Sequence, residues 1–367
     1  MSLKLEARRQ TAPIMVWLTP ILAVALTLLA GSALFAALGF DPVQALHSYF
    51  IQPVSSLYGL AELGVKATPL ALIAVGLAIG FRANVWNIGA EGQLTLGAIC
   101  GGGVALAFYE SGGWWTLPLM MAAGVLGGMA WAAIPALLRT RFNASEILVS
   151  LMLTYVATLI LGMLVRGPWK DPEGFNFPQS RLFDADATLP LLMSGSRLHI
   201  GALFALAVVA AGWVLLARSL IGFQVKVIGL APDAAAYAGF SQKRMVWFCL
   251  LLSGGLAGLA GLFEVAGPIG QLTPTVSPGY GFTAIIVAFL GRLNPIGILL
   301  AALLLALTFI GGEATQISMG LPVAVTGVFQ GMLLFFLLAC DVLVRYRLRW
   351  QGATPAAAPA PLREAAE

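Results

Sequence analysis

The sequence predicts an all-α fold, that of a polytopic integral membrane protein with about ten transmembrane helices, some of them broken or re-entrant. Two observations predict this class. Of the 367 residues, 59% are hydrophobic and 10% are charged, whereas a water-soluble domain carries about 25% charged residues. Many apolar runs also continue without interruption for the roughly 18 residues that cross a bilayer. Because polar and apolar positions do not alternate in these runs, they exclude a membrane β-barrel.

The first apolar run, 14–38, follows a short basic leader. It is longer than the hydrophobic region of a signal peptide, and no clear cleavage site follows it, so we expect a retained helix that starts in the cytoplasm. The second helix starts near residue 58 and is most hydrophobic toward its end. The eighth run is short and is counted as a crossing. In chain order, the predicted spans are 14–38, 58–81, 94–108, 116–138, 147–165, 200–217, 245–266, 282–290, 296–310 and 323–344.

The distribution of basic residues supports ten crossings. Cytoplasmic loops of membrane proteins carry an excess of Lys and Arg. With ten alternating spans and a cytoplasmic N-terminus, 15 of the 20 basic residues fall on the cytoplasmic side. Both termini are therefore predicted in the cytoplasm. The basic residues left on the outer side are Lys66, Arg166, Lys170, Arg181 and Arg197.

The spans group into one transmembrane domain, residues 1–348, with two long loops. Residues 166–199 form a polar, proline-containing loop on the outer face, which is either a contact for an extracellular partner or a solvated connector. Residues 218–244 form the longest internal cytoplasmic loop. The tail, 349–367, is rich in Ala and Pro and is predicted to be disordered.

Two segments interrupt the apolar pattern with Gly and Pro, at 84–93 and 267–281. Broken helices persist at membrane depth only where they face protein or a watery path, and transporters use them to present backbone groups to a substrate. We therefore expect a solute path beside these segments. The residues assigned to it are Asn87, Glu91, Gln93, Tyr280 and Thr283.

Several of the polar residues also have a purely structural interpretation. Glu91 is equally suited to capping the helix that it starts, and Tyr280 to anchoring a span at the membrane interface. Glu146 follows Asn143 at the spacing of a capping box. No acid lies clearly in the middle of a span, which argues against coupling to an ion gradient.

The sequence lacks the motifs of common catalytic sites. It contains no phosphate-binding P-loop, no H-E-x-x-H and no G-x-S-x-G. The three cysteines, Cys100, Cys249 and Cys340, lie far apart in apolar runs and are expected to be small buried hydrophobes. With only two histidines, we expect no metal site, no cofactor and no enzymatic activity. Uphill movement of a solute would need a partner or an ion gradient.

Four motifs resemble the permease subunits of bacterial ABC importers, in the group that includes ribose and branched-chain amino acid permeases. The similarity covers nearly the whole chain, from about residue 15 to 348. Within this group, NIGAEGQ and the outer-loop string VRGPWKDPEGFNFPQS at 165–180 are similar to nucleoside permeases. The motifs are NIGAEGQLTLGA at 87–98, GLAPDAAAYAGF at 229–240, SGGLAGLAGLFEVAG at 253–267 and PGYGFTAIIVAFLGRLNPIG at 278–297.

The resemblance implies a type II ABC importer in the bacterial inner membrane that carries nucleosides. It implies cytoplasmic ATP-binding subunits, a second related permease chain in a heterodimer, and an extracytoplasmic substrate-binding lipoprotein, with no nucleic-acid partner. In one departure, many relatives have Asn-Pro where this chain has Ala231-Pro232, so a helix-capping side chain is lost.

The resemblance implies that an ATPase pushes on this chain from the cytoplasm, and the 218–244 loop is the internal cytoplasmic loop long enough to receive the push. Within it, proline favours a helix start, aspartate suits the positive first turn, alanines favour the helix, and glycine ends it. A short helix that docks on the ATPase is expected. Its residues are Pro232, Asp233, Ala234, Ala235, Tyr237, Ala238 and Gly239.

Other functions remain open on sequence alone. The same machinery could carry a sugar or another small polar solute. A secondary transporter would work without ATP and depend on an ion gradient. A membrane-embedded enzyme is the weakest alternative, because the catalytic motifs are missing.

Overall fold

A computed structural model describes residues 2–7 and 13–351 of the chain. The chain divides into two compact units, residues 35–330 and the combination of 1–34 with 331–367. Each predicted span coincides with a helix, which confirms the all-α polytopic fold. Two short strands occur among the described residues, and both belong to the terminal unit.

The terminal unit contains most of α1 (Pro13–Ala37) and of α13 (Ala324–Arg345). It also contains β1 (Ser2–Ala7) and β2 (Tyr346–Gln351), which pair antiparallel with Ser2 opposite Gln351. The tail predicted to be disordered therefore begins inside β2, and residues 352–367 lie outside the described part of the chain.

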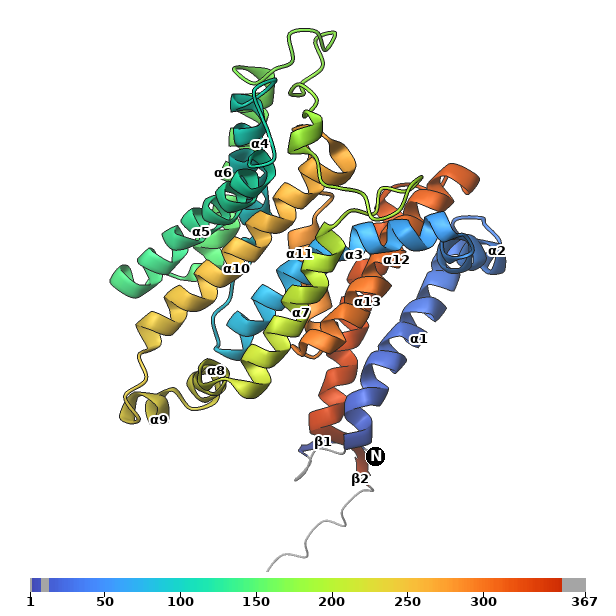
Figure 1. Ribbon diagram of the computed structural model, residues 1–367. Coiled ribbons are helices and arrows are strands. Elements are labelled where there is room, and N and C mark those ends of the chain that lie inside the picture. Colours follow the sequence, from blue (N-terminus) through green and yellow to red (C-terminus); the bar gives the residue numbers. More distant parts are fainter. Residues whose placement is uncertain (1, 8–12, 352–367) are drawn as a thin grey trace, which may run out of the picture. The chain divides into compact units, whose positions relative to one another are not determined.

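Residues 35–330 form a bundle of helices (Figure 1). The loop at 218–244 is mostly helical, since α8 and α9 occupy it. Short segments of π-helix lie at His47–Ile51 and Val265–Ile269, and short segments of 3-10 helix lie at Gln52–Val54 and Ala185–Ala187. The helices are α2 (Pro42–Leu46), α3 (Leu57–Arg82), α4 (Ala90–Ala107), α5 (Thr116–Phe142), α6 (Glu146–Arg166), α7 (Gly201–Arg218), α8 (Leu220–Leu230), α9 (Pro232–Tyr237), α10 (Gln242–Glu264), α11 (Tyr280–Leu290) and α12 (Pro295–Met319).

Seven helices in the described residues are long and apolar enough to cross a bilayer: α1, α3, α5, α6, α7, α10 with its π-turn, and α12. The other three predicted spans coincide with α4, α11 and α13. Helix α11 has only 11 residues, about half of what a crossing needs. A count of ten crossings with both termini in the cytoplasm stays a prediction.

The centre of the bundle is built from α3 and α10, with 83% and 72% of their apolar windows buried, against 22–28% for α5, α6 and α7. Helices α4, α5 and α10 approach closely through glycines. A Cβ on Gly97 would lie 2.2 Å from the Cα of Gly258, and a Cβ on Gly128 would lie 2.1 Å from the carbonyl oxygen of Gly254. Small residues permit such close backbone packing in membranes. The less buried helices present apolar surface to their surroundings, as lipid-facing helices do.

The two long loops lie at opposite ends of this bundle (Figure 1). At one end, Arg197 forms an ion pair with Glu62, near the start of α3. At the other, α8 packs against the end of α3, where a Cβ on Gly229 would lie 1.9 Å from the carbonyl oxygen of Arg82. Twenty helical residues separate Glu62 from Arg82, a rise of about 30 Å, the thickness of the hydrocarbon core. We name these the loop end (residues 167–200) and the α9 end (α8 and α9).

Candidate solute path and coupling surface

The two broken segments meet inside the bundle. The carboxylate of Glu91, in the first turn of α4, accepts a hydrogen bond from the backbone N–H of Gly281, in the first turn of α11, at 2.6 Å. A Cβ on Gly281 would lie 2.3 Å from the backbone nitrogen of Glu91, so only glycine permits this approach. We call this contact the junction.

The two helices leave the junction in opposite directions. The end of α11 reaches the end of α3, where the rings of Phe289 and Phe81 stack with centroids 5.4 Å apart. Helix α4 runs toward the loop end, where a Cβ on Gly103 would lie 2.9 Å from the ring of Trp169. The positive N-terminal ends of both helix dipoles therefore converge near Glu91, a position that favours a carboxylate.

Side chains satisfy the free N–H groups at the start of α11. Ser277 accepts hydrogen bonds from the backbone N–H groups of Gly279 and Tyr280, at 3.1 and 2.9 Å. Helix α4 has no side-chain cap. The alternative that Glu91 satisfies the free N–H groups of its own helix is therefore wrong, because its carboxylate reaches across the break to α11. The sequence shows a glutamate at the start of α4, but it does not show that its partner is the backbone of Gly281.

A buried polar network holds the break before α4. The amide of Asn87 donates to Gln93 at 2.7 Å and to Ser253 of α10 at 2.9 Å, and Gln93 donates back at 3.0 Å. The carbonyl oxygen of the Asn87 side chain also accepts from the backbone N–H of Gly89 at 3.1 Å. Buried polar groups that are paired in this way fix one conformation, so the network anchors the break to α10.

Tyr280 and Thr283 lie in the first turn of α11, on either side of Gly281 in the sequence. The ring of Tyr280 meets Phe309 edge-on, with centroids 5.3 Å apart, and Lys66 lies 5.8 Å from its centroid. Thr283 donates to the side chain of Gln330 at 3.2 Å. The structure thus gathers the predicted path residues around the junction. All five are at least 91% buried, so a solute could touch them only if the helices moved apart.

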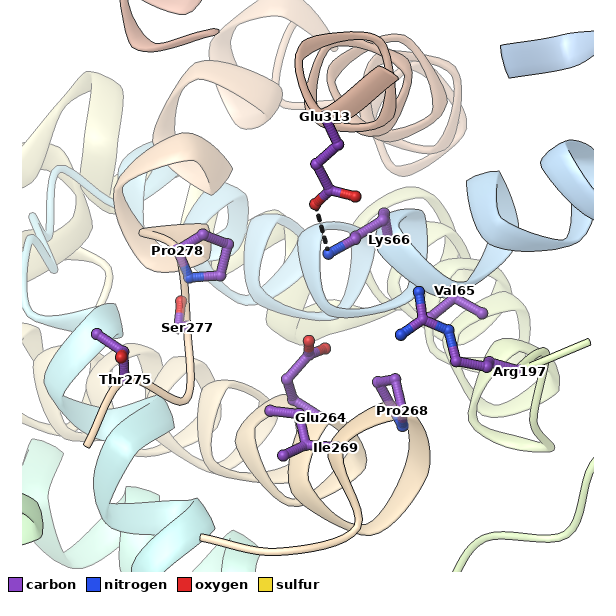
Figure 2. A pocket seen from close by; sticks show the side chains of 10 residues that line it. All are labelled: Val65, Lys66, Arg197, Glu264, Pro268, Ile269, Thr275, Ser277, Pro278 and Glu313. Atoms are coloured by element: carbon purple, nitrogen blue, oxygen red, sulfur yellow. Dashed lines mark ion pairs between the residues drawn. The ribbon is translucent and has the colours of Figure 1, made fainter. Parts of the chain in front are cut away.

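A cavity of about 400 Å³ opens at the loop end (Figure 2). Its lining residue Lys66 lies over the ring of Tyr280. In the sequence, Glu264 and Glu313 lie near the outer ends of spans, and nothing there brings them together with cations. The feature of the sequence that could have pointed to this cavity is the presence of charged residues near the ends of apolar runs. The lining residues are Val65, Lys66, Arg197, Glu264, Pro268, Ile269, Thr275, Ser277, Pro278 and Glu313.

Both cations of this cavity are already paired. The ammonium of Lys66 lies 3.3 Å from Glu313 (Figure 2). The guanidinium of Arg197 donates two hydrogen bonds to Glu62, at 3.0 and 2.5 Å, and this pairing raises its pKa above the ordinary value. Glu264 faces the same space with no ion-pair partner within 4.0 Å in the described residues. The walls thus offer hydrogen-bonding groups without an unpaired cation.

His199 closes the loop end as a neutral group. It is 98% buried, and its Nδ1 atom accepts a hydrogen bond from the backbone N–H of Gly201 at 3.1 Å. Burial lowers its pKa to about 4. Because the uncharged imidazole accepts a hydrogen bond from the first residue of α7, it caps that helix. The structure finds no group of three acids, cysteines or histidines fit for a metal within the described residues.

At the α9 end, α9 occupies the segment expected to dock on an ATPase. Proline starts it, Ala231 precedes it with no side-chain cap, and Gly239 follows it with φ +82°. Tyr237 is 98% exposed, whereas Ala235 is only 1% exposed and faces the chain itself. The outward surface is therefore formed by Tyr237 and its exposed neighbours, and Ala235 supports it from within.

Glu146 does not form a capping box with Asn143. Asn143 instead ends α5 with φ 54°, and Ser145 precedes α6. The carboxylate of Glu146 pairs with Arg139 and accepts from the backbone N–H of Trp86 at 3.2 Å. The spacing was right for a cap, but the chain reverses direction at Asn143, so Glu146 ties the α5–α6 turn to the segment before α4.

A helical membrane chain in which two helices start inside the bundle, beside a polar cavity, has the architecture of a transport component. The family model described as "Branched-chain amino acid transport system / permease component" matches residues 59–338. The chain belongs to this permease family.

Relatives with curated names support the same assignment. The glucose ABC transporter permease protein of Haloferax volcanii is 38% identical, over 94% of this chain and 93% of its own length. The nucleoside permease protein of Lactococcus lactis is 28% identical over 87% and 90%, and the guanosine permease protein of Bacillus subtilis is 29% identical over 92% and 97%. The resemblance to ABC permeases is therefore confirmed. The chain is a permease subunit, and a separate subunit hydrolyses ATP.

Proposed function

We propose that this permease imports an uncharged solute built on a sugar ring, either a nucleoside or a monosaccharide. The observation that carries the proposal is the pairing of both cavity cations with carboxylates of the chain, Lys66 with Glu313 and Arg197 with Glu62. A phosphorylated or carboxylated solute would have to compete for these cations. A neutral polyhydroxyl solute needs only hydrogen bonds in place of those it loses with water, and Ser277, Thr275 and Glu264 can provide them.

The nucleoside is the first candidate. Two of the relatives described above are named for nucleosides or guanosine, and the similarity to them covers 87–92% of this chain. The monosaccharide is the second candidate, favoured by the higher identity of the glucose permease relative. The residues that line the loop-end cavity include no aromatic ring on which a base could stack, which also favours the monosaccharide.

The path that we propose runs from the loop-end cavity to the junction, and from there along α11 to the α9 end. Passage requires α4 and α11 to separate at Glu91 and Gly281, which exposes Asn87, Gln93 and Thr283. Helix α9 receives the push of the ATPase. We also propose an inner-membrane location with both termini in the cytoplasm, pairing with a different permease chain, and delivery of solute by an extracytoplasmic lipoprotein. The family itself implies ATP-binding subunits and a substrate-binding protein.

Uptake by vesicles tests the proposal. The chain would be reconstituted with its partner permease, ATP-binding subunits and binding protein, and uptake of labelled guanosine and glucose measured with and without internal ATP. We expect ATP-dependent uptake of one of them, insensitive to ionophores, with no competition from the matching phosphorylated compound. Strong competition by the phosphorylated compound would contradict the uncharged solute, and ionophore-sensitive uptake without ATP would contradict the mechanism.

A further inference from the structure

A second cavity, of about 280 Å³, lies at the α9 end between α8 and the start of α10. It is distinct from the surface that α9 presents through Tyr237. Apolar side chains form most of its wall, and Gln224, Ser241 and Arg244 add polar groups. Its lining residues are Ile221, Gln224, Ile228, Gly239, Phe240, Ser241, Arg244, Met245 and Phe248.

This cavity lies where two membrane spans end. Helix α7 is a candidate span that ends at Arg218, two residues before α8 begins, and the span that includes α10 begins at Gln242. Helix α8 is apolar but too short to cross. It leaves Leu220, Phe223 and Leu230 exposed, at 68%, 55% and 76%. A short helix that exposes large apolar side chains beside a span end is suited to the boundary between headgroups and acyl chains.

The charge around this cavity is positive. Residues 218–244 contain four basic side chains and one acid, Asp233. Arg244 lines the cavity, and no ion-pair partner within 4.0 Å is found for it among the described residues. None of the lining residues is acidic. The basic side chains are Arg218, Lys226, Lys243 and Arg244.

We propose that this cavity binds an anionic phospholipid. The apolar wall formed by Ile221, Ile228 and Phe248 receives an acyl chain, and Arg244 binds the phosphate of the headgroup, a geometry that a guanidinium favours. Basic side chains at a membrane surface attract anionic lipid with about 1 kcal/mol each. Because Gly239 and Phe240 join α9 to this wall, bound lipid would brace the segment that follows the coupling helix.

Lipid retention by the purified, complete transporter tests this proposal. Native mass spectrometry would compare phosphatidylglycerol with phosphatidylcholine of the same acyl chains, in wild type and in Arg244→Gln. We expect wild type to retain phosphatidylglycerol preferentially, and Arg244→Gln to weaken that retention about fivefold, the equivalent of ~1 kcal/mol. Gln224→Trp, which fills the cavity without changing charge, should weaken retention of both lipids.

Arg141→Gln is the matched control. Arg141 is also an exposed arginine, in the last turn of α5, and does not line the cavity. An equal loss in Arg141→Gln, or unchanged retention in Arg244→Gln, would overturn the proposal. So would displacement of the lipid by inorganic phosphate, because the site would then bind a free anion. Cross-linking of Phe248, on the apolar wall of the cavity, to the ATP-binding subunit in the membrane would identify a protein occupant instead and would equally overturn it.

Discussion

Glu91 accepts a hydrogen bond from the backbone of Gly281 at 2.6 Å, although 190 positions of sequence separate them. The contact joins the first turns of two helices, α4 and α11, whose positive ends both point at one carboxylate. In water such a group would be an ordinary helix cap. Inside a membrane bundle, the carboxylate holds together two helices whose separation would open a path. A tighter contact at the junction is therefore expected to stabilise the protein and to hinder transport.

Replacing Glu91 with alanine should weaken the junction. The N–H of Gly281 would lose its acceptor in a buried site, which costs about 1–3 kcal/mol, and two like dipole ends would face each other uncompensated. We expect a lower melting temperature and a solute leak in the absence of ATP. Glu91→Gln keeps an acceptor oxygen and should be milder. Thermal unfolding in detergent and passive solute efflux from vesicles measure the two effects.

The control is Glu110→Gln, in the turn after α4, where the side chain is exposed. A fall in melting temperature as large as that of Glu91→Ala would show that loss of any carboxylate destabilises the protein. If Glu91→Ala were as stable and as tightly sealed as wild type, the junction would not hold α4 and α11 together.

Gly281→Ala tests the same contact through shape alone. The added Cβ would lie 2.3 Å from the backbone nitrogen of Glu91, which forces α4 and α11 apart. Overpacking of this kind costs about 1–3 kcal/mol, so the melting temperature should fall. Gly327→Ala is the control, since a Cβ there meets no atom within 4 Å, and alanine favours a helix by up to about 1 kcal/mol. Similar behaviour of the two variants would contradict the assigned packing.

Much of this fold follows from the sequence. Apolar runs predict the helices because a bilayer requires satisfied backbone groups over a fixed length. The segments 84–93 and 267–281 stood out through their Gly and Pro residues, and the structure brings them together. Their partners could not be predicted, because hydropathy says nothing about which helix faces which. Capping of α4 was the structural alternative for Glu91, and its contact with α11 depends on an approach of distant segments that the sequence does not show.

The loop-end cavity shows the same limit. Lys66, Glu264 and Glu313 each read as single charges near span ends, a place where charged side chains reach the interface at little cost. The structure shows that two of them pair and all three line one space. Ion pairs between distant segments leave no spacing in a single sequence, so neither the pairing of Lys66 nor that of Arg197 could be found in advance.

Acidification should destabilise the protein through His199. Burial lowers its pKa to about 4 in the folded state, below the 6.5 of an unfolded chain. The unfolded state therefore binds more protons below pH 6.5, and stability falls as pH decreases from about 6.5 to 4, by up to about 3 kcal/mol. His199→Asn, which keeps an acceptor for the N–H of Gly201, should flatten this dependence.

Melting temperatures measured in detergent between pH 4 and pH 7 check the effect. His47→Asn, which removes an exposed histidine, is the control. A wild-type melting temperature that stays constant across this range would show that His199 does not titrate as the structure requires.

The last prediction separates docking from folding at α9. Tyr237 is 98% exposed and Ala235 is 1% exposed on the same short helix, so substitutions at these positions should have different consequences. Tyr237→Ala removes an aromatic anchor of the kind that dominates interfaces, and we expect ATP hydrolysis without uptake, in a protein of unchanged melting temperature. Ala235→Glu buries a charge within the chain, so it should lower the melting temperature before any partner is present. Melting curves of the isolated permease, with ATPase and uptake assays of the assembled transporter, distinguish the two.

Ala234→Glu, at an exposed neighbour, should behave like Tyr237→Ala. Normal uptake in both Tyr237→Ala and Ala234→Glu would show that the ATPase pushes on another part of the chain.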